Sequence, residues 1–185
     1  MKDEKVITIK GEHHKFSLRR DIVQGSELYK KVVYAIQEFV QKGKRDLLDL
    51  YTYQGLVFDY QLGHNLIATT GRTVLARLLA GDNTYTGEVN YGALGDGTTP
   101  FTNASTQLNN EIYRMIPSSQ SYDSNIAYID FFVASGDTPD DTFEEWGTFI
   151  DGTASADSGQ AFSLFITGGW VKSGSVYISS KYTIN

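Results

Sequence analysis

One glycine-rich stretch near the middle of the chain, Tyr91–Pro100, most constrains how this sequence can fold. It reads Y-G-A-L-G-D-G-T-T-P, so three glycines and an Asp-Gly step are followed by a proline. Glycine reaches positive φ angles at low cost, and the residue before a proline is restricted to extended conformations. We therefore predict a rigid turn between two regular regions. Its structural residues are Gly92, Gly95, Asp96, Gly97 and Pro100.

The sequence after this turn predicts strands. Apolar and polar residues alternate over Ser175–Asn185, and Ile126–Ala134 is the most apolar candidate, for which we predict an interior position. The 18 glycines and the aromatic content of 13% are also typical of strands and turns. We predict a mainly β fold, with an antiparallel β-sandwich or jelly-roll-like body over residues 61–185. One short helix is expected near its start, over Arg72–Ala80, and Gly81 would end it.

Residues 1–60 are expected to form an N-terminal arm. Two short alternating runs, Lys5–Lys10 and Lys15–Arg20, lie on either side of Gly11–His14 and predict a hairpin. Further along, residues 46–63 are expected to be strand-like, because apolar and polar residues alternate in their second half.

Between these two parts, the arm contains an amphipathic helix. Ser26 is suited to cap its start, and Gly43 is suited to end it. Apolar residues recur three and four positions apart, and a stripe this wide is buried either on the following domain or on another subunit. The sequence leaves both open, and our hypothesis is an assembly interface. Its residues are Leu28, Val32, Ile36, Phe39 and Val40.

Charge is divided unevenly along the chain. Residues 1–50 carry 11 Lys and Arg against 8 Asp and Glu, whereas residues 51–185 carry 5 against 14. Positive charge that is interleaved with negative charge is weak for phosphate binding, so no direct nucleic-acid partner is expected. No apolar run is long enough for a membrane helix, and the first residues lack a signal peptide's apolar region. We therefore expect no membrane partner and synthesis in a cytosol.

The residue types that carry catalysis are sparse. There are no cysteines and 3 histidines, of which His13 and His14 lie in the predicted hairpin turn and His64 stands beside a glycine. Neither an H-E-x-x-H nor a G-x-S-x-G motif occurs. The G-x-x-G-x-G spacing of the central turn does not match a phosphate-binding loop. We expect no catalytic residue, no cofactor and no metal site, and we predict that the protein is not an enzyme.

Two acidic arrangements offer weaker chemical hypotheses. Asp137–Asp141 crowds three carboxylates on one loop, which could supply oxygen ligands for Ca²⁺, although the EF-hand spacing is absent. Glu144 and Glu145 precede Trp146, as a glycoside hydrolase site with an aromatic wall would require. A tryptophan in an alternating run is more often a core residue, so solvated loops and a core strand are the favoured interpretations.

Four segments occur in a characteristic order. They read N-L-I-A-T-T-G-R-T-V-L-A-R-L-L-A-G over Asn65–Gly81, then Tyr91–Pro100, then L-N-N-E-I-Y-R over Leu108–Arg114, then E-E-W-G-T-F-I-D-G over Glu144–Gly152. This order resembles a domain of minor structural proteins of tailed bacteriophages, which include tail-fibre and baseplate components. The resemblance covers Gly63–Asn185, and residues 1–60 match nothing in that family.

The resemblance implies a non-enzymatic structural component of a tailed-phage virion, in the tail, the tail-fibre attachment or the head–tail region. Its partners would be other virion proteins, and it would form a homo-oligomer. It would be located in the virion after assembly in the host cytoplasm. The alternative is a receptor- or carbohydrate-binding module of the adsorption apparatus, which exposed Tyr and Trp side chains clustered at one end of the sandwich would favour. A small hydrolase is a third hypothesis.

Overall fold

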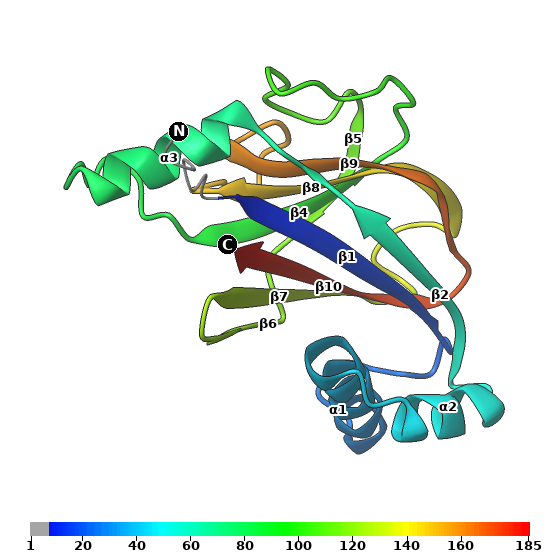
Figure 1. Ribbon diagram of the computed structural model, residues 1–185. Helices are drawn as coiled ribbons and strands as arrows, with labels where there is room; N and C mark the ends of the chain where they lie inside the picture. The colour runs from blue at the N-terminus through cyan, green and yellow to red at the C-terminus, as the bar shows by residue number, and fades with distance from the viewer. Residues whose placement is uncertain (1–7) are drawn as a thin grey trace.

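The computed structural model describes residues 8–185, and over these residues it contains two five-stranded antiparallel sheets and three helices (Figure 1). The strand order is β2-β1-β10-β7-β6 in the first sheet and β3-β9-β8-β4-β5 in the second. The bounds in chain order are β1 Ile9–Leu18, α1 Glu27–Lys42, α2 Asp46–Tyr53, β2 Val57–His64, β3 Leu66–Ile67, α3 Thr69–Leu79, β4 Val89–Gly95, β5 Glu111–Met115, β6 Ser119–Asp123, β7 Ile126–Val133, β8 Asp141–Ile150, β9 Gln160–Lys172 and β10 Ser175–Ile184.

The main hydrophobic core lies between the two sheets. Phe131 on β7 and Ile178 on β10 contribute to it from the first sheet, and Leu94 on β4 and Trp146 on β8 contribute from the second. All four are almost completely buried. Alternating side chains of both sheets therefore meet face to face, as in a β-sandwich. The prediction of a mainly β, sandwich-like fold is confirmed, and so is the interior position of β7, which lies between β10 and β6.

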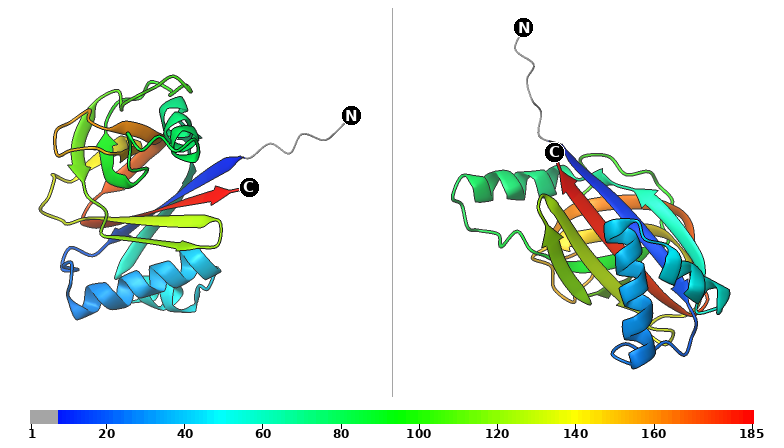
Figure 2. Two further views of the ribbon diagram at one scale, coloured as in Figure 1. Left: turned by 90° about the vertical axis from the view of Figure 1, so that its left-hand side faces the viewer. Right: turned by 60° about the horizontal axis from the view of Figure 1, so that its bottom comes forward.

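Helices α1 and α2 cover the outer face of the first sheet (Figures 1 and 2). The predicted caps of α1 are confirmed. Ser26 Oγ accepts a hydrogen bond of 3.1 Å from the backbone N–H of Tyr29, and Gly43 adopts a φ of 69° after the last turn. Beneath the helix, Phe16 on β1 and Tyr177 on β10 form a second hydrophobic layer with α1. The first sheet thus has a core on each of its faces.

The N-terminal region differs from the predicted hairpin. Gly11–His14 is not a turn, because β1 runs through it without a break and pairs with β10 over its whole length and with β2 over most of it. The part of the predicted hairpin before Thr8 lies outside the described residues. The predicted boundary between residues 60 and 61 falls inside β2. Residues 9–18 therefore form an interior strand of the first sheet, between β2 and β10.

Residues 46–63 were expected to be strand-like, but Asp46–Tyr53 forms α2. Leu48 and Tyr51, three positions apart, pack in the second hydrophobic layer, between the helices and the first sheet. This packing stabilises the short helix. At the other end of the chain, β9 runs through Gly168–Gly169 and continues to Lys172. The two glycines have φ angles of 68° and 97° and lie in a bulge opposite Glu144.

Helix α3 confirms the short helix that the sequence predicts near the start of the body. It packs on β9, with Gly71 close to the backbone of Phe162, and Gly81 follows its last turn with a φ of 80°. Val74 is buried in the main core, whereas Leu79 at the end of the helix is 89% exposed. The second half of α3 therefore projects beyond the sheets (Figure 1).

Candidate functional site

Three of the four segments in the characteristic order meet on the second sheet. Strand β4 carries the first half of the central turn and pairs with β8 on one side and with β5 on the other. Glu145 on β8 lies at their junction with no exposed surface. Its carboxylate accepts hydrogen bonds of 3.0 and 3.1 Å from the backbone N–H groups of Asn109 and Asn110. This buried carboxylate therefore fixes the segment that leads into β5.

The glycines of the central turn are required for close approach rather than for positive φ. Gly92 and Gly95 lie within β4, and only residues 96–100 are irregular. None of the three glycines has a positive φ. A Cβ on Gly92 would lie 2.5 Å from the ring of Trp146, and one on Gly97 would lie 2.7 Å from the carboxylate of Glu145. Our prediction that these residues reach positive φ is therefore wrong.

The other two turn residues lie in the loop that follows β4. Asp96 Oδ1 accepts a hydrogen bond of 2.6 Å from the side-chain amide of Asn110, which links this loop to the segment before β5. Pro100 follows in the same loop and, like every described residue, is joined by a trans peptide bond.

The pair Glu111 and Arg114 forms a second buried charge contact beside Glu145. The guanidinium donates two hydrogen bonds of 2.7 Å to the carboxylate, and both side chains are buried. Residues three apart on a regular strand face opposite ways. A bulge at Ile112 removes this obstacle, because Tyr113 and Glu111 oppose consecutive residues of β4. Arg114 also lies over the ring of Phe149 at 4.6 Å, so the pair is enclosed.

The structure places the predicted interface residues against the chain's own first sheet. Val32 and Ile36 are fully buried and Val40 nearly so, and all three pack in the layer beneath α1. Leu28 and Phe39 are partly buried against the same layer. The sequence leaves open whether the stripe is buried on the chain's own domain or on another subunit. In the structure it is buried on the chain's own domain, so its apolar residues contribute to folding.

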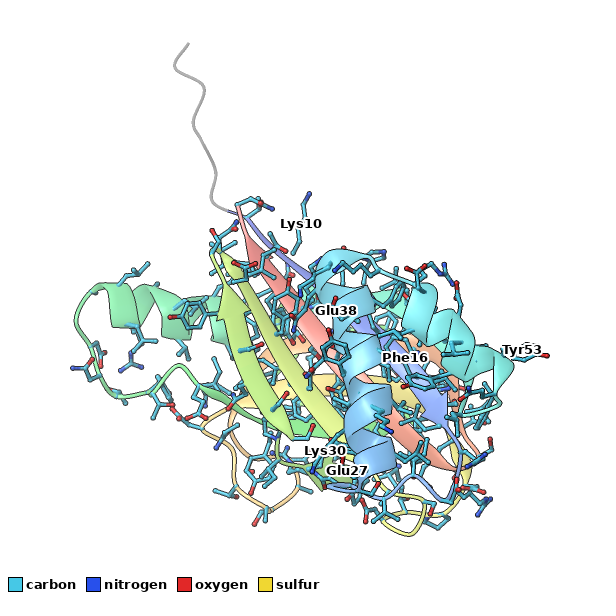
Figure 3. The ribbon with its side chains drawn as sticks, turned by 90° about the horizontal axis from the view of Figure 1, so that it is seen from below. Lys10, Phe16, Glu27, Lys30, Glu38 and Tyr53 are labelled. Atoms are coloured by element: carbon cyan, nitrogen blue, oxygen red, sulfur yellow. The ribbon has the colours of Figure 1, made fainter. Side chains whose placement is uncertain are left out.

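An apolar surface that the sequence did not single out lies on α2 and β2. Leu47, Leu50 and Tyr53 follow each other at intervals of three on α2 and are 39%, 45% and 91% exposed. Figure 3 shows Tyr53 projecting from the end of α2, away from the body. Phe58 and Leu62 on β2, the edge strand that follows, are about half exposed. We call these five residues the α2–β2 surface.

His13 lies in the main core, at the centre of a polar network. Trp146 Nε1 donates to His13 Nδ1 at 3.2 Å, and Ser180 Oγ lies 2.8 Å from the same nitrogen. Because Nδ1 is an acceptor, the proton of the neutral ring lies on Nε2, which faces Ser163 Oγ at 3.4 Å. Burial, together with the smaller effects of the nearby His14 and His64, lowers the pKa of His13 to about 3. This histidine is therefore a neutral structural group.

His14 and His64 lie elsewhere. The His14 side chain points to the opposite face of β1, where its Nδ1 lies 2.9 Å from the hydroxyl of Tyr60, and burial lowers its pKa. His64 is exposed at the end of β2.

The acidic loop Asp137–Asp141 is held by contacts within the chain. Asp137 accepts a hydrogen bond from the backbone N–H of Ala134, and Asp140 pairs with Arg20 and with the buried Lys172. Among residues 8–185, no group of three His, Cys, Asp or Glu side chains is arranged to hold a metal ion.

The glycosidase hypothesis places Glu144, Glu145 and Trp146 in one cleft, and the structure does not bring them together in that way. Glu145 is committed to Asn109 and Asn110, and Trp146 is a core side chain. Trp170, the other tryptophan of the chain, is also buried, so neither indole is available as an exposed platform for a sugar. The strongly exposed tyrosines, Tyr53 and Tyr122, lie on α2 and β6.

Searches of protein-family models, of curated proteins and of solved structures found no match to this chain. The resemblance of the four segments to phage structural proteins therefore stays a prediction. Over the residues that the structure describes, no helix has both the length and the apolar character needed to cross a membrane.

Proposed function

We propose that this chain is a non-enzymatic structural component of a tailed-phage virion, in the tail, the tail-fibre attachment or the head–tail region. It acts by protein–protein assembly with other virion proteins and with further copies of itself. The observation that carries the proposal is the α2–β2 surface. The chain uses the stripe of α1 for its own core and leaves a second apolar row, on α2, uncovered.

A row of leucines followed by a tyrosine that is 91% exposed gains free energy when a partner covers it, and tyrosine is frequent at the centres of interfaces. Charged groups such as Arg45 and Asp49, which form a pair of 3.5 Å on α2, lie beside this row and would form a polar rim.

The order of the four segments also supports the virion assignment. Three of them pack together around Glu145, and the fourth contains α3, which packs on β9 of the same sheet. The segments that carry the resemblance therefore form one structural unit.

The experiment compares the solution mass of the full chain with that of two variants, by light scattering after size exclusion. The first variant is Leu50→Asp with Tyr53→Asp, and the matched control is Leu79→Asp, at an apolar residue of α3 that is 89% exposed, about as much as Tyr53. We expect the full chain and the control to form a defined oligomer and the double variant to be a monomer with unchanged thermal stability. A monomeric full chain, or a double variant with the mass of the oligomer, would contradict the proposal.

A further inference from the structure

A cavity of about 370 Å³ opens at the end of the sandwich where β1 begins and β10 ends. It lies between the two sheets and beside α3. The start of β1 and the end of β10, which contribute to its lining, are on the left of Figure 1. Residues of the first sheet line it from β1, β6, β7 and β10, and residues of the second sheet line it from β4 and β9. It shares no lining residue with the α2–β2 surface.

The walls of this cavity are apolar. Ile129 and Phe162, which belong to the main core, form part of its lining, together with Leu75 of α3 and Val89 of β4. The cavity opens to solvent at its rim, where Tyr122 and Ile184 are 84% and 47% exposed. Apolar cavities offer water few hydrogen bonds and bind compact apolar molecules instead.

The inner part of the lining adds no charge. Tyr182 lines the cavity, and its hydroxyl is hydrogen-bonded to Thr148 Oγ1 at 2.7 Å and to Ser163 Oγ at 2.8 Å. Burial raises the pKa of this phenol to about 12, so it stays neutral. Because the hydroxyl is already paired, the part of a ligand that enters the cavity has to be apolar.

The rim carries polar groups that include one negative charge, and the hydroxyls of Ser121 and Tyr122 can either donate or accept a hydrogen bond. Gln120 Nε2 donates to the backbone oxygen of Val89 at 3.0 Å, which leaves the Oε1 atom of Gln120 as an acceptor. Glu88, an exposed residue, adds a carboxylate, and no Lys, Arg or His belongs to the lining. A hydrogen-bond donor or a positive charge is therefore favoured at this end of a ligand, and a negative charge is disfavoured.

We propose that this cavity binds a small molecule with a compact apolar body and a neutral or cationic end that donates hydrogen bonds. A volume of about 370 Å³ lies in the usual range of ligand pockets. This site is separate from the proposed assembly function and does not depend on it.

The test uses two probes of the same shape and opposite charge, 1-adamantylamine and adamantane-1-carboxylate, titrated into the full chain by calorimetry. We expect the amine to bind with one site per chain, with a dissociation constant below about 1 mM, and the carboxylate to bind at least about tenfold more weakly. If neither probe binds at about 1 mM, or if the carboxylate binds as tightly as the amine, the proposal is overturned.

Two variants and one control locate the site. Ala127→Phe fills the cavity from β7 and should abolish binding, whereas Ala104→Phe, at an exposed alanine outside the lining, should leave it unchanged. Glu88→Gln, at the exposed rim, should reduce the preference for the amine by about three- to fivefold. A folded Ala127→Phe chain that binds as the parent does would refute the location. If Ala127→Phe does not fold, Glu88→Gln decides, and an unchanged preference refutes it.

Discussion

At position 92, the space available for a side chain is set by two rings from distant strands. A Cβ there would lie 2.5 Å from Trp146 and 2.7 Å from Phe131, and both rings are fully buried. We predict that Gly92→Ala lowers the free energy of unfolding by about 1–3 kcal/mol, because an overpacked core forces side chains and backbone to shift. Urea denaturation measures this.

Gly136→Ala is the matched control, because nothing lies within 4 Å of a Cβ at this exposed position and its φ is not positive. Its expected effect is neutral or slightly stabilising. Equal effects of the two substitutions would show that the close approach at Gly92 does not constrain the fold.

His13 makes stability depend on pH. Its folded pKa of about 3 lies below the ordinary value of 6.5, so between these values the unfolded chain binds one proton more than the folded chain. Stability therefore falls as pH falls below about 6.5, by up to about 1.4 kcal/mol per pH unit. We predict that His13→Gln removes this part of the slope between pH 4 and pH 6. The test is urea denaturation at several pH values, and parallel slopes for the two proteins would contradict the assignment.

The sequence predicted a structural role for the glycines of the central turn, but neither the place of Gly92 and Gly95 within β4 nor the reason for them. A glycine pattern in one strand carries no information about Trp146 or Glu145, which approach it from β8. The same limit applies to Glu145 and to His13. Their roles arise from contacts with residues more than 30 positions away, and local spacing does not encode such contacts.

Helix α1 could be predicted almost to the residue, because its caps and its stripe are local signals. What covers the stripe is a non-local property, and here it is the first sheet. We predict that Ile36→Ala, at a fully buried position, costs about 2–5 kcal/mol of stability. Tyr34→Ala, on the exposed face of the same helix, should change stability by less than about 0.5 kcal/mol.

Thermal melts of both variants measure this difference. A small effect of Ile36→Ala on stability, together with a loss of oligomer, would instead return the α1 stripe to the assembly role that the sequence suggested.

The sequence prediction was wrong at two further places, Gly11 and α2, and the structure shows why. Gly11 resembles a turn residue, but a Cβ there would lie 2.0 Å from the side chain of Asn65, so packing against Asn65 explains the glycine. Helix α2 has apolar residues on both its buried and its exposed face, with Leu48 inside and Leu50 outside. Such a helix shows no clear period of 3.6 residues, so its sequence did not distinguish it from a strand.

For the whole molecule, the mainly β class followed from composition and alternation, whereas the sheet order did not. Strand β1 pairs with β10, which lies more than 150 residues later in the chain. Pairing at such separation is fixed by the complementarity of whole faces. It joins β1 and β2 to the C-terminal strands in a single sheet, so residues 8–60 do not form the separate arm that the sequence predicts.

The most direct test of the virion assignment is mass spectrometry of tailed-phage particles purified from the organism that encodes this chain. We expect the chain to be present in intact particles, in a fixed ratio to the other structural proteins, and to stay with the tail fraction or the head–tail fraction when particles are disrupted. Its absence from purified particles, while it is abundant in the lysate, would contradict the assignment. The α2–β2 surface would then require a partner outside the virion.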